Sequence, residues 1–126
     1  CFLYDARFRR LMWSIFKRAG DIKSNVVMKK ITEGWSPFII DVRSLGEVQK
    51  TGAIPGTNLV KSHDKIRSAL KSIPKKGDVL LLCRSGKRSR IAYRTLTASG
   101  INAARLYNLK GGIAAWTRNS GRLEKY

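Results

Sequence analysis

The residues best suited to chemistry lie in one short segment, Cys83-Arg84-Ser85-Gly86-Lys87-Arg88-Ser89. An apolar run typical of a buried strand, residues 79–82, comes directly before it, and a helical pattern follows it. A loop in this place would turn successive backbone N–H groups inward, and the helix N-terminus would add partial positive charge. Gly86 permits backbone conformations that other residues avoid. The segment therefore predicts an anion-binding loop around a cysteine.

The setting of Cys83 favours its thiolate, the reactive form of cysteine. The cations of Arg84, Lys87 and Arg88 and the inward N–H groups should all lower the pKa of the thiol. A thiolate held in this way could act as a nucleophile, and the same cradle would stabilise a persulfide, whose outer sulfur is an anion. The competing interpretation is a buried structural cysteine beside a solvated basic turn.

Other polar residues are weaker candidates for a functional role. Asp41 follows a predicted strand and is expected to accept hydrogen bonds that hold loops near Cys83. Arg43 and Glu47 are interpreted as a structural ion pair or a turn brace. His63 is the only histidine, and it lacks a neighbouring Cys, His or acidic cluster. We therefore expect no metal site and no other cofactor.

The rest of the chain alternates between strands and helices. Strands are predicted over residues 22–23, 37–42, 58–60, 79–82 and 104–107. Helices are predicted over residues 24–33, 44–50, 62–72 and 87–99, and from 111–112 onward. This alternation indicates an α/β fold with a mainly parallel sheet, in which active sites lie beyond the carboxyl ends of the strands. Trp13, Trp35 and Trp116 are expected in the core or at an interface.

The chain is strongly basic, with 26 Lys and Arg against 8 Asp and Glu and a net charge of +18. Such a surface attracts anions, whether nucleic acid, acidic lipid, acidic protein or a small oxyanion, or it is simply solvated. Nucleic acid is not expected as the sole partner, because the sequence has no helix-turn-helix or aromatic-basic RNA motif. No apolar stretch approaches the roughly 20 residues that span a bilayer.

Residues 1–18 form a pattern of their own, with apolar side chains at three- and four-residue spacing and five cations mostly between them. We predict a basic amphipathic helix over residues 1–19, followed by one domain over residues 20–126. This helix packs on the domain, binds a partner, or lies on an anionic membrane surface. The chain begins with Cys1 and not with Met, which indicates processing or a longer parent protein.

Three motifs together resemble the rhodanese family. The loop CRSGKRS, residues 83–89, resembles the family's active-site loop. Upstream, Ile40-Asp41-Val42-Arg43, then Glu47, then GAIPGTNL over residues 52–59 resemble its DVR…E…G-H-I-P-G-A-x-N stretch, with Ala53 in place of the histidine. Downstream, LKGGIAAW over residues 109–116 resembles its L-x-G-G-x-x-x-W ending. The matches occur in the family's order over about residues 22–118.

The resemblance implies a single-domain sulfurtransferase whose mainly parallel sheet has helices on both faces. Cys83 would be the catalytic nucleophile, and Asp41 and Arg43 would be supporting residues. The substrate-binding loop would comprise Arg84, Ser85, Gly86, Lys87, Arg88 and Ser89. The enzyme would take a sulfane sulfur from a small anionic donor, thiosulfate or a persulfide, and pass it to a thiol, small or protein-borne, or to cyanide.

Loop length distinguishes sulfur transfer from phosphate chemistry. Related dual-specificity phosphatases have a longer loop, C-x5-R, because a phosphoryl group needs a wider ring of N–H donors than one sulfur does. Here Cys83 and Arg88 give C-x4-R, and the next position is Ser89. Sulfur is therefore favoured, while arsenate reduction, also known among rhodanese-like proteins, stays open. The remaining alternatives are a non-catalytic partner-binding module and a sulfur carrier working near RNA. The expected location is the cytoplasm, at a membrane face if residues 1–18 bind lipid.

Overall fold

The computed structural model describes residues 20–126, which form one five-stranded sheet with helices on both faces. The strands are β1 (Asp21–Ile22), β2 (Phe38–Asp41), β3 (Thr57–Val60), β4 (Val79–Leu82) and β5 (Leu106–Leu109). The α-helices are α2 (Ser24–Thr32), α3 (Leu45–Thr51), α4 (Lys87–Ala98) and α5 (Gly112–Arg118), and the 3₁₀-helices are η3 (His63–Ser72) and η4 (Ala103–Arg105). The helix predicted at the N-terminus, with Trp13, lies outside the described residues.

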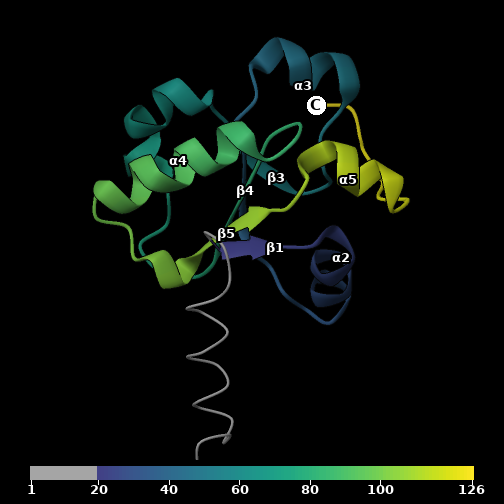
Figure 1. The fold of residues 1–126 in the computed structure, drawn as a ribbon, viewed down its shortest axis with the longest axis horizontal. Helices are drawn as coiled ribbons and strands as arrows, with labels where there is room; N and C mark the ends of the chain where they lie inside the picture. Colours follow the sequence, from purple (N-terminus) through teal and green to yellow (C-terminus); the bar gives the residue numbers. More distant parts are fainter. Residues whose placement is uncertain (1–19) are drawn as a thin grey trace, which may run out of the picture.

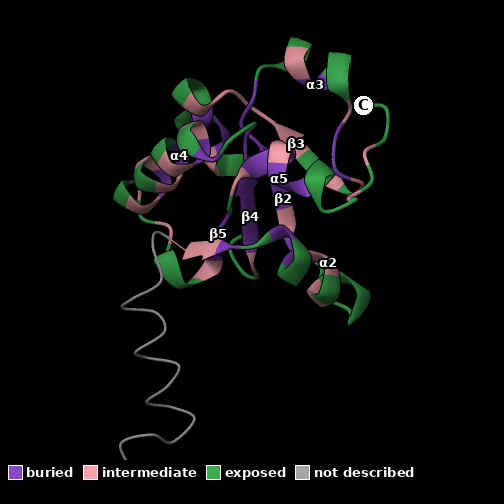
Figure 2. Cartoon of the chain, turned by 45° about the vertical axis from the view of Figure 1, so that its right-hand side comes forward, coloured by how far each residue is buried: buried purple, intermediate pink, exposed green. Residues whose placement is uncertain are grey.

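All strand pairings of the sheet are parallel, in the order β1-β5-β4-β2-β3. Strand β4 lies in the middle, and all four of its residues, Val79–Leu82, are buried. Figure 2 shows the buried strands at the centre of the molecule, with exposed helix surfaces around them. The predicted α/β fold with a parallel sheet is therefore confirmed.

Helices cover the two faces of the sheet and enclose two apolar cores. On one face α4 and η3 bury Ala92, Leu96 and Ile66 against strand residues that include Leu81. On the other face α2 and α5 bury Val27 and Trp116 against the opposite side of the same strands. Figure 1 shows α4 and α2 on different sides of the strands. None of the described helices has the length and apolar character needed to cross a membrane.

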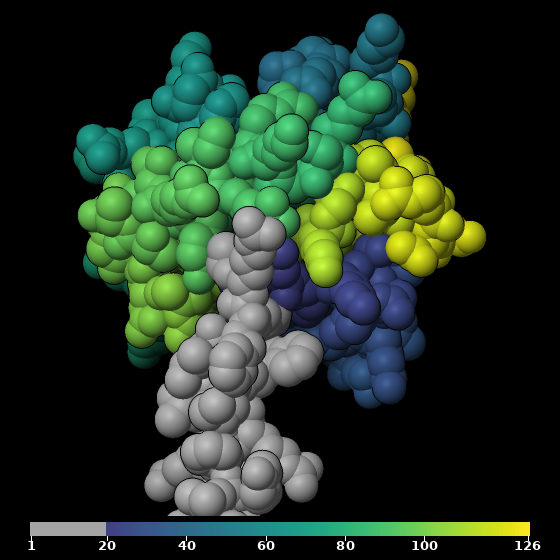
Figure 3. Space-filling model, in the orientation of Figure 1, coloured from purple at the N-terminus to yellow at the C-terminus, as the bar shows by residue number. Residues whose placement is uncertain are grey.

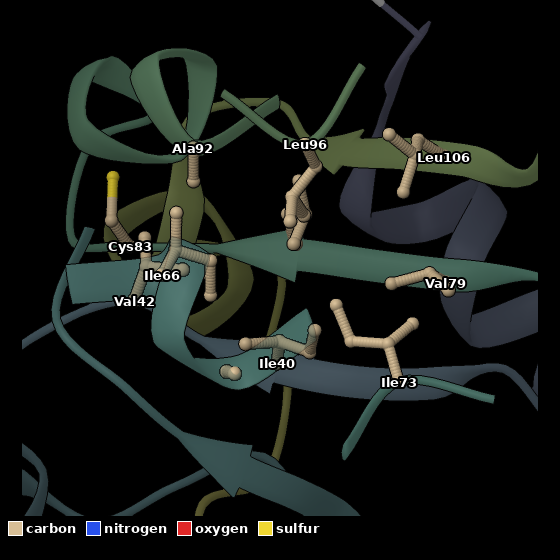
Figure 4. Close-up of a cluster of buried hydrophobic side chains, with 11 residues drawn as sticks. Ile40, Val42, Ile66, Ile73, Val79, Cys83, Ala92, Leu96 and Leu106 are labelled. Carbon is tan, nitrogen blue, oxygen red and sulfur yellow. The ribbon is translucent and has the colours of Figure 1, made fainter. Parts of the chain in front are cut away.

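Cys83 comes one residue after the end of β4, where the central strand leaves the sheet. It belongs to the core cluster beneath α4 and has no exposed surface. In Figure 4 it lies at one end of the row of labelled side chains, with its sulfur turned away from Val42 and Ile66. The apolar core therefore fixes the backbone of Cys83 while its sulfur faces the loop that follows.

Two elements differ from the sequence prediction. The segment after β3 is a 3₁₀-helix, and its buried residues Ile66 and Ala69 are three positions apart, as three residues per turn require. The last strand begins at Leu106, two residues later than predicted. The reason is local, because the Asn102 side chain accepts a hydrogen bond from the N–H of Ala104 and stabilises a short turn first.

A buried ion pair fastens the end of β2 to the segment beyond it. The Arg43 guanidinium contacts the Asp41 carboxylate at 2.7 Å, and the two side chains are 2% and 0% exposed. Arg43 also donates to the Thr51 hydroxyl and to the Gly52 carbonyl, at 2.7 Å and 2.9 Å. One guanidinium therefore ties β2 to the far end of α3. Arg43 is paired with Asp41 and not with Glu47, so the ion pair considered from the sequence is wrong, whereas the alternative of a turn brace fits the contacts of Arg43.

We predict that Arg43→Met lowers the free energy of unfolding by about 3–5 kcal/mol, because it leaves the Asp41 carboxylate buried without a partner. Urea denaturation of the full chain measures this change. Arg67→Met is the matched control, since Arg67 is exposed and its side chain has no hydrogen-bond or ion-pair partner among the residues that the structure describes. Equal stability of the two variants would show that the buried pair is not an important brace.

Candidate active site

The sulfur of Cys83 is the point on which the loop converges. The N–H of Gly86 lies 3.0 Å from the Sγ atom, and the Ser89 hydroxyl oxygen lies 3.5 Å from it. Gly86 has a φ of +103°, a conformation that glycine adopts without strain. Ser89 is completely buried in the first turn of α4. The loop thus wraps around a single sulfur atom at a helix N-terminus.

Two opposing effects set the pKa of the Cys83 thiol. Burial is the larger single effect and raises the pKa. The interaction with the Ser89 hydroxyl lowers the pKa, and so do the N–H groups of Ser89, Gly86 and Ser85, which donate hydrogen bonds to the sulfur. Together these donors outweigh burial, so the pKa lies below its ordinary value and the thiolate is favoured.

The Ser89 hydroxyl has two acceptors within reach but only one hydrogen. Its oxygen lies 3.1 Å from the Gly86 carbonyl and 3.5 Å from the Cys83 sulfur. Beside a neutral thiol, the S–H donates to the Ser89 oxygen, and the hydroxyl donates to the carbonyl. Beside a thiolate, the hydroxyl can rotate to donate to the sulfur. Ser89 therefore suits both protonation states of Cys83.

Helix α5 holds the loop from the side. The N–H of Ile113 donates to the Cys83 carbonyl at 2.9 Å, and the N–H of Ala114 donates to the Arg84 carbonyl at 3.0 Å. This close approach requires Gly112, because a Cβ atom there would lie 2.3 Å from the Cys83 carbonyl oxygen. The Gly-Gly pair in the downstream motif therefore has a direct structural role beside the cysteine.

Arg88 is held by an acid of α3. Its guanidinium forms two contacts with the Glu47 carboxylate, at 2.6 Å and 2.9 Å. These contacts lower the pKa of Glu47 to about 2, mainly through the hydrogen bond from Arg88, and raise the pKa of Arg88. Glu47 also accepts from Ser44 in the capping box of α3. Arg88 therefore links the loop to α3, whereas the sequence suggested that it faces a substrate.

Arg84 and Lys87 are the exposed cations of the loop, and within the described part of the chain neither forms a side-chain hydrogen bond or an ion pair. Ser85 is exposed as well, and it contributes its backbone N–H to the sulfur. Asp41 and Arg43, predicted as supporting residues, are buried at the neighbouring end of β2. The tertiary structure thus places all the predicted site residues at one edge of the sheet.

The sequence interpretation missed two contributions to this site. It gave no role to the backbone of Ile113 and Ala114, which contacts the loop from 30 residues further along the chain. It also did not identify Glu47 as the partner of Arg88. The His63 N–H donates to the Val42 carbonyl at 3.1 Å, and its buried Nδ1 atom has no hydrogen-bond partner among residues 20–126. Among residues 20–126, no group of three or more His, Cys, Asp or Glu side chains could hold a metal ion.

We predict that Ser89→Ala raises the pKa of Cys83, because the thiolate loses its only side-chain hydrogen-bond donor within the described residues. The rate of iodoacetamide alkylation at Cys83, followed against pH by mass spectrometry of its peptide, should then have its midpoint at higher pH. Ser85→Ala is the control, since Ser85 acts through its backbone N–H and should leave the midpoint in place. An unchanged midpoint in Ser89→Ala would assign the stabilisation to the backbone alone.

Comparison with known proteins identifies the family of this chain. A family model described as a rhodanese-like domain matches residues 24–119. The chain is 33% identical over 100 residues to a sulfurtransferase of Allochromatium vinosum, over 79% of this chain and 90% of that protein.

Two solved structures extend the comparison. A rhodanese-like domain protein from Staphylococcus aureus is 29% identical, with a TM-score of 0.70, over 82% of this chain and 97% of that one. A thiosulfate sulfurtransferase from Pseudomonas aeruginosa is 26% identical, with a TM-score of 0.69, over 82% of this chain and 20% of that one. Because the matched family model covers most of the sequence and includes Cys83 with its whole loop, this chain belongs to the rhodanese-like domain family.

Proposed function

We propose that this protein is a sulfurtransferase that carries a sulfane sulfur as a persulfide on Cys83. The observation that carries the proposal is the convergence of the Gly86 N–H and the Ser89 hydroxyl on one buried sulfur whose pKa is lowered. A relative 33% identical to this chain is named a sulfurtransferase, which supports the same chemistry.

The first half-reaction is nucleophilic attack by the Cys83 thiolate on the sulfane sulfur of thiosulfate. A Cys–S–S⁻ persulfide forms as the S–S bond of thiosulfate breaks, and sulfite leaves with the electron pair of that bond. The lowered pKa of Cys83 makes a general base unnecessary. Arg84 and Lys87 are the exposed cations that attract the dianionic donor.

The second half-reaction returns the thiolate. A thiol acceptor, small or protein-borne, attacks the outer sulfur, or cyanide does so in an assay and leaves as thiocyanate. The S–S bond of the persulfide breaks, and its electron pair stays on the Cys83 sulfur. The loop donors stabilise the departing thiolate as they stabilise the starting one, so one cradle serves both halves of a ping-pong cycle.

The geometry gives less support to the alternatives. A module that only binds partners has no need of a cysteine with a lowered pKa. A phosphatase of the related type needs the loop arginine on the phosphate, whereas here both contacts of Arg88 engage Glu47. The Cys83–Arg88 spacing of four intervening residues also leaves a smaller ring than C-x5-R does.

We predict that thiosulfate adds one sulfur, about 32 Da, to Cys83, and that Cys83→Ser lowers thiosulfate:cyanide turnover by at least about a thousandfold, because the nucleophile is lost. Intact-protein and peptide mass spectrometry with thiocyanate detection measure both effects. Cys1→Ser is the matched control, because Cys1 lies outside the loop, and it should keep full turnover. Full activity in Cys83→Ser would show that Cys83 is not the sulfur-carrying nucleophile.

We also predict negligible hydrolysis of p-nitrophenyl phosphate, because the loop is one residue too short and its arginine is bound by Glu47. The same preparation must show sulfur transfer, so that inactivity is not mistaken for misfolding. Phosphate release by the unmodified protein that disappears in Cys83→Ser would show that the loop accepts a phosphoryl group.

A further inference from the structure

The charge around the Cys83 loop is one-sided because the neighbouring acids are already paired. Asp41 is bound by Arg43, and Glu47 is bound by Arg88. Arg84 and Lys87 of the loop have no such partner and are exposed. The surface around the Cys83 loop therefore carries two cations, Arg84 and Lys87, whose charge is not neutralised within the described part of the molecule.

Two more cations, Lys110 before α5 and Arg118 at its end, lie on the same side of the sheet. Lys110 is exposed directly after β5, at the carboxyl edge of the sheet to which Cys83 also belongs. Exposed Arg118 is at the end of α5, but its side chain reaches back, with an Nη atom 4.0 Å from the Cβ position of Gly111. The Gly111 nitrogen is itself 3.5 Å from the Cβ position of Gly86 in the loop. Neither cation forms an ion pair or a side-chain hydrogen bond with another of residues 20–126.

Exposed apolar side chains stand beside these cations. Leu45, 51% exposed, begins α3 two residues before Glu47, which binds Arg88. Ile91, 46% exposed, follows Arg88 by three residues and so shares its side of α4. Figure 3 shows the surfaces of α3, α4 and α5 adjoining on one face of the molecule. Mixed apolar and cationic surface of this kind suits a protein partner better than a phosphate backbone.

The buried position of the Cys83 sulfur also favours recognition of the acceptor through the surrounding surface. Cys83 itself has no exposed surface, and a persulfide places the outer sulfur about 2 Å beyond Sγ. An acceptor thus meets one sulfur atom, while most of its contact area lies on the surrounding surface. Recognition of a macromolecular acceptor therefore depends on the residues around the loop.

We propose that Arg84, Lys87, Lys110 and Arg118, with Leu45 and Ile91, form a docking surface for an acidic protein segment that presents a cysteine thiol. This rests on the proposed function, since the docked thiol is the sulfur acceptor. The acceptor thiolate attacks the outer sulfur of the Cys83 persulfide, and a new S–S bond forms. The old S–S bond breaks with its electron pair on Cys83, and the proton of the acceptor thiol goes to solvent.

The test compares two synthetic peptides, each with one cysteine, flanked by Glu in one and by Gln in the other. Full-chain protein is loaded with thiosulfate and freed of donor, and peptide persulfide is followed by quenched mass spectrometry. The Glu peptide should react about tenfold faster or more at low salt, and about 0.5 M salt should remove most of that advantage. Equal rates for the two peptides would overturn the docking surface.

Charge variants locate the effect. Lys110→Gln with Arg118→Gln should remove most of the advantage of the Glu peptide and leave cyanide turnover within about twofold, because neither residue contacts the sulfur. Lys75→Gln with Lys76→Gln is the control, since these exposed lysines precede β4 at the opposite edge of the sheet. Equal losses in the two double variants would mean that only net charge matters and would overturn the proposal.

Two further measurements separate the remaining outcomes. Binding of a Cys-free Glu peptide, followed by fluorescence anisotropy, tests the surface without sulfur chemistry. If no persulfide forms but this binding depends on Lys110 and Arg118, the proposed function fails and the docking surface stands. If a single-stranded RNA displaces the Glu peptide and binds more tightly through the same two residues, the surface is a nucleic-acid site and the acidic-protein proposal is wrong.

Discussion

A negative charge on a buried sulfur is the constraint on which this structure depends. Burial alone penalises the Cys83 thiolate, and only converging donors reverse the penalty. Donors act only if they stay within about 3 Å to 3.5 Å of the sulfur, so the loop has to be rigid. The surrounding helices and strands keep this short loop in one conformation.

Three parts of the structure hold the loop in place. The core under α4 fixes Cys83 from below, since the residue is part of the apolar cluster on that face. Helix α5 holds the carbonyls of Cys83 and Arg84 from the side, and a side chain at Gly112 would prevent this contact. Helix α3 holds Arg88 through Glu47, and the Asp41–Arg43 pair fastens α3 to the sheet. These contacts with the rest of the protein, and not contacts within the loop alone, keep the loop in its conformation.

The same pairing arrangement explains the electrostatics of the surface. The chain has few acids, and three of those in the described region form internal ion pairs, with Arg43, Arg88 and Arg90. Acids used as structural partners cannot neutralise the cations that remain exposed. Positive charge consequently gathers outside the site, where it favours anionic donors and acidic partners. The cations exposed around the site therefore keep their charge because the acids nearest to them, Asp41 and Glu47, are paired elsewhere.

The sequence by itself determined the fold class and the place of Cys83, the candidate nucleophile, between a strand and a helix. Periodicity placed β4 and α4 around Cys83, because strand and helix patterns are local properties of the chain. It did not determine which acid binds Arg88, because Glu47 lies 41 residues away and several cations were available to it. Nor did it reveal the contact of Ile113 with Cys83 or the approach of Arg118 to Gly111. These depend on how α5 packs against the sheet, and only the tertiary structure decides which distant groups share one edge.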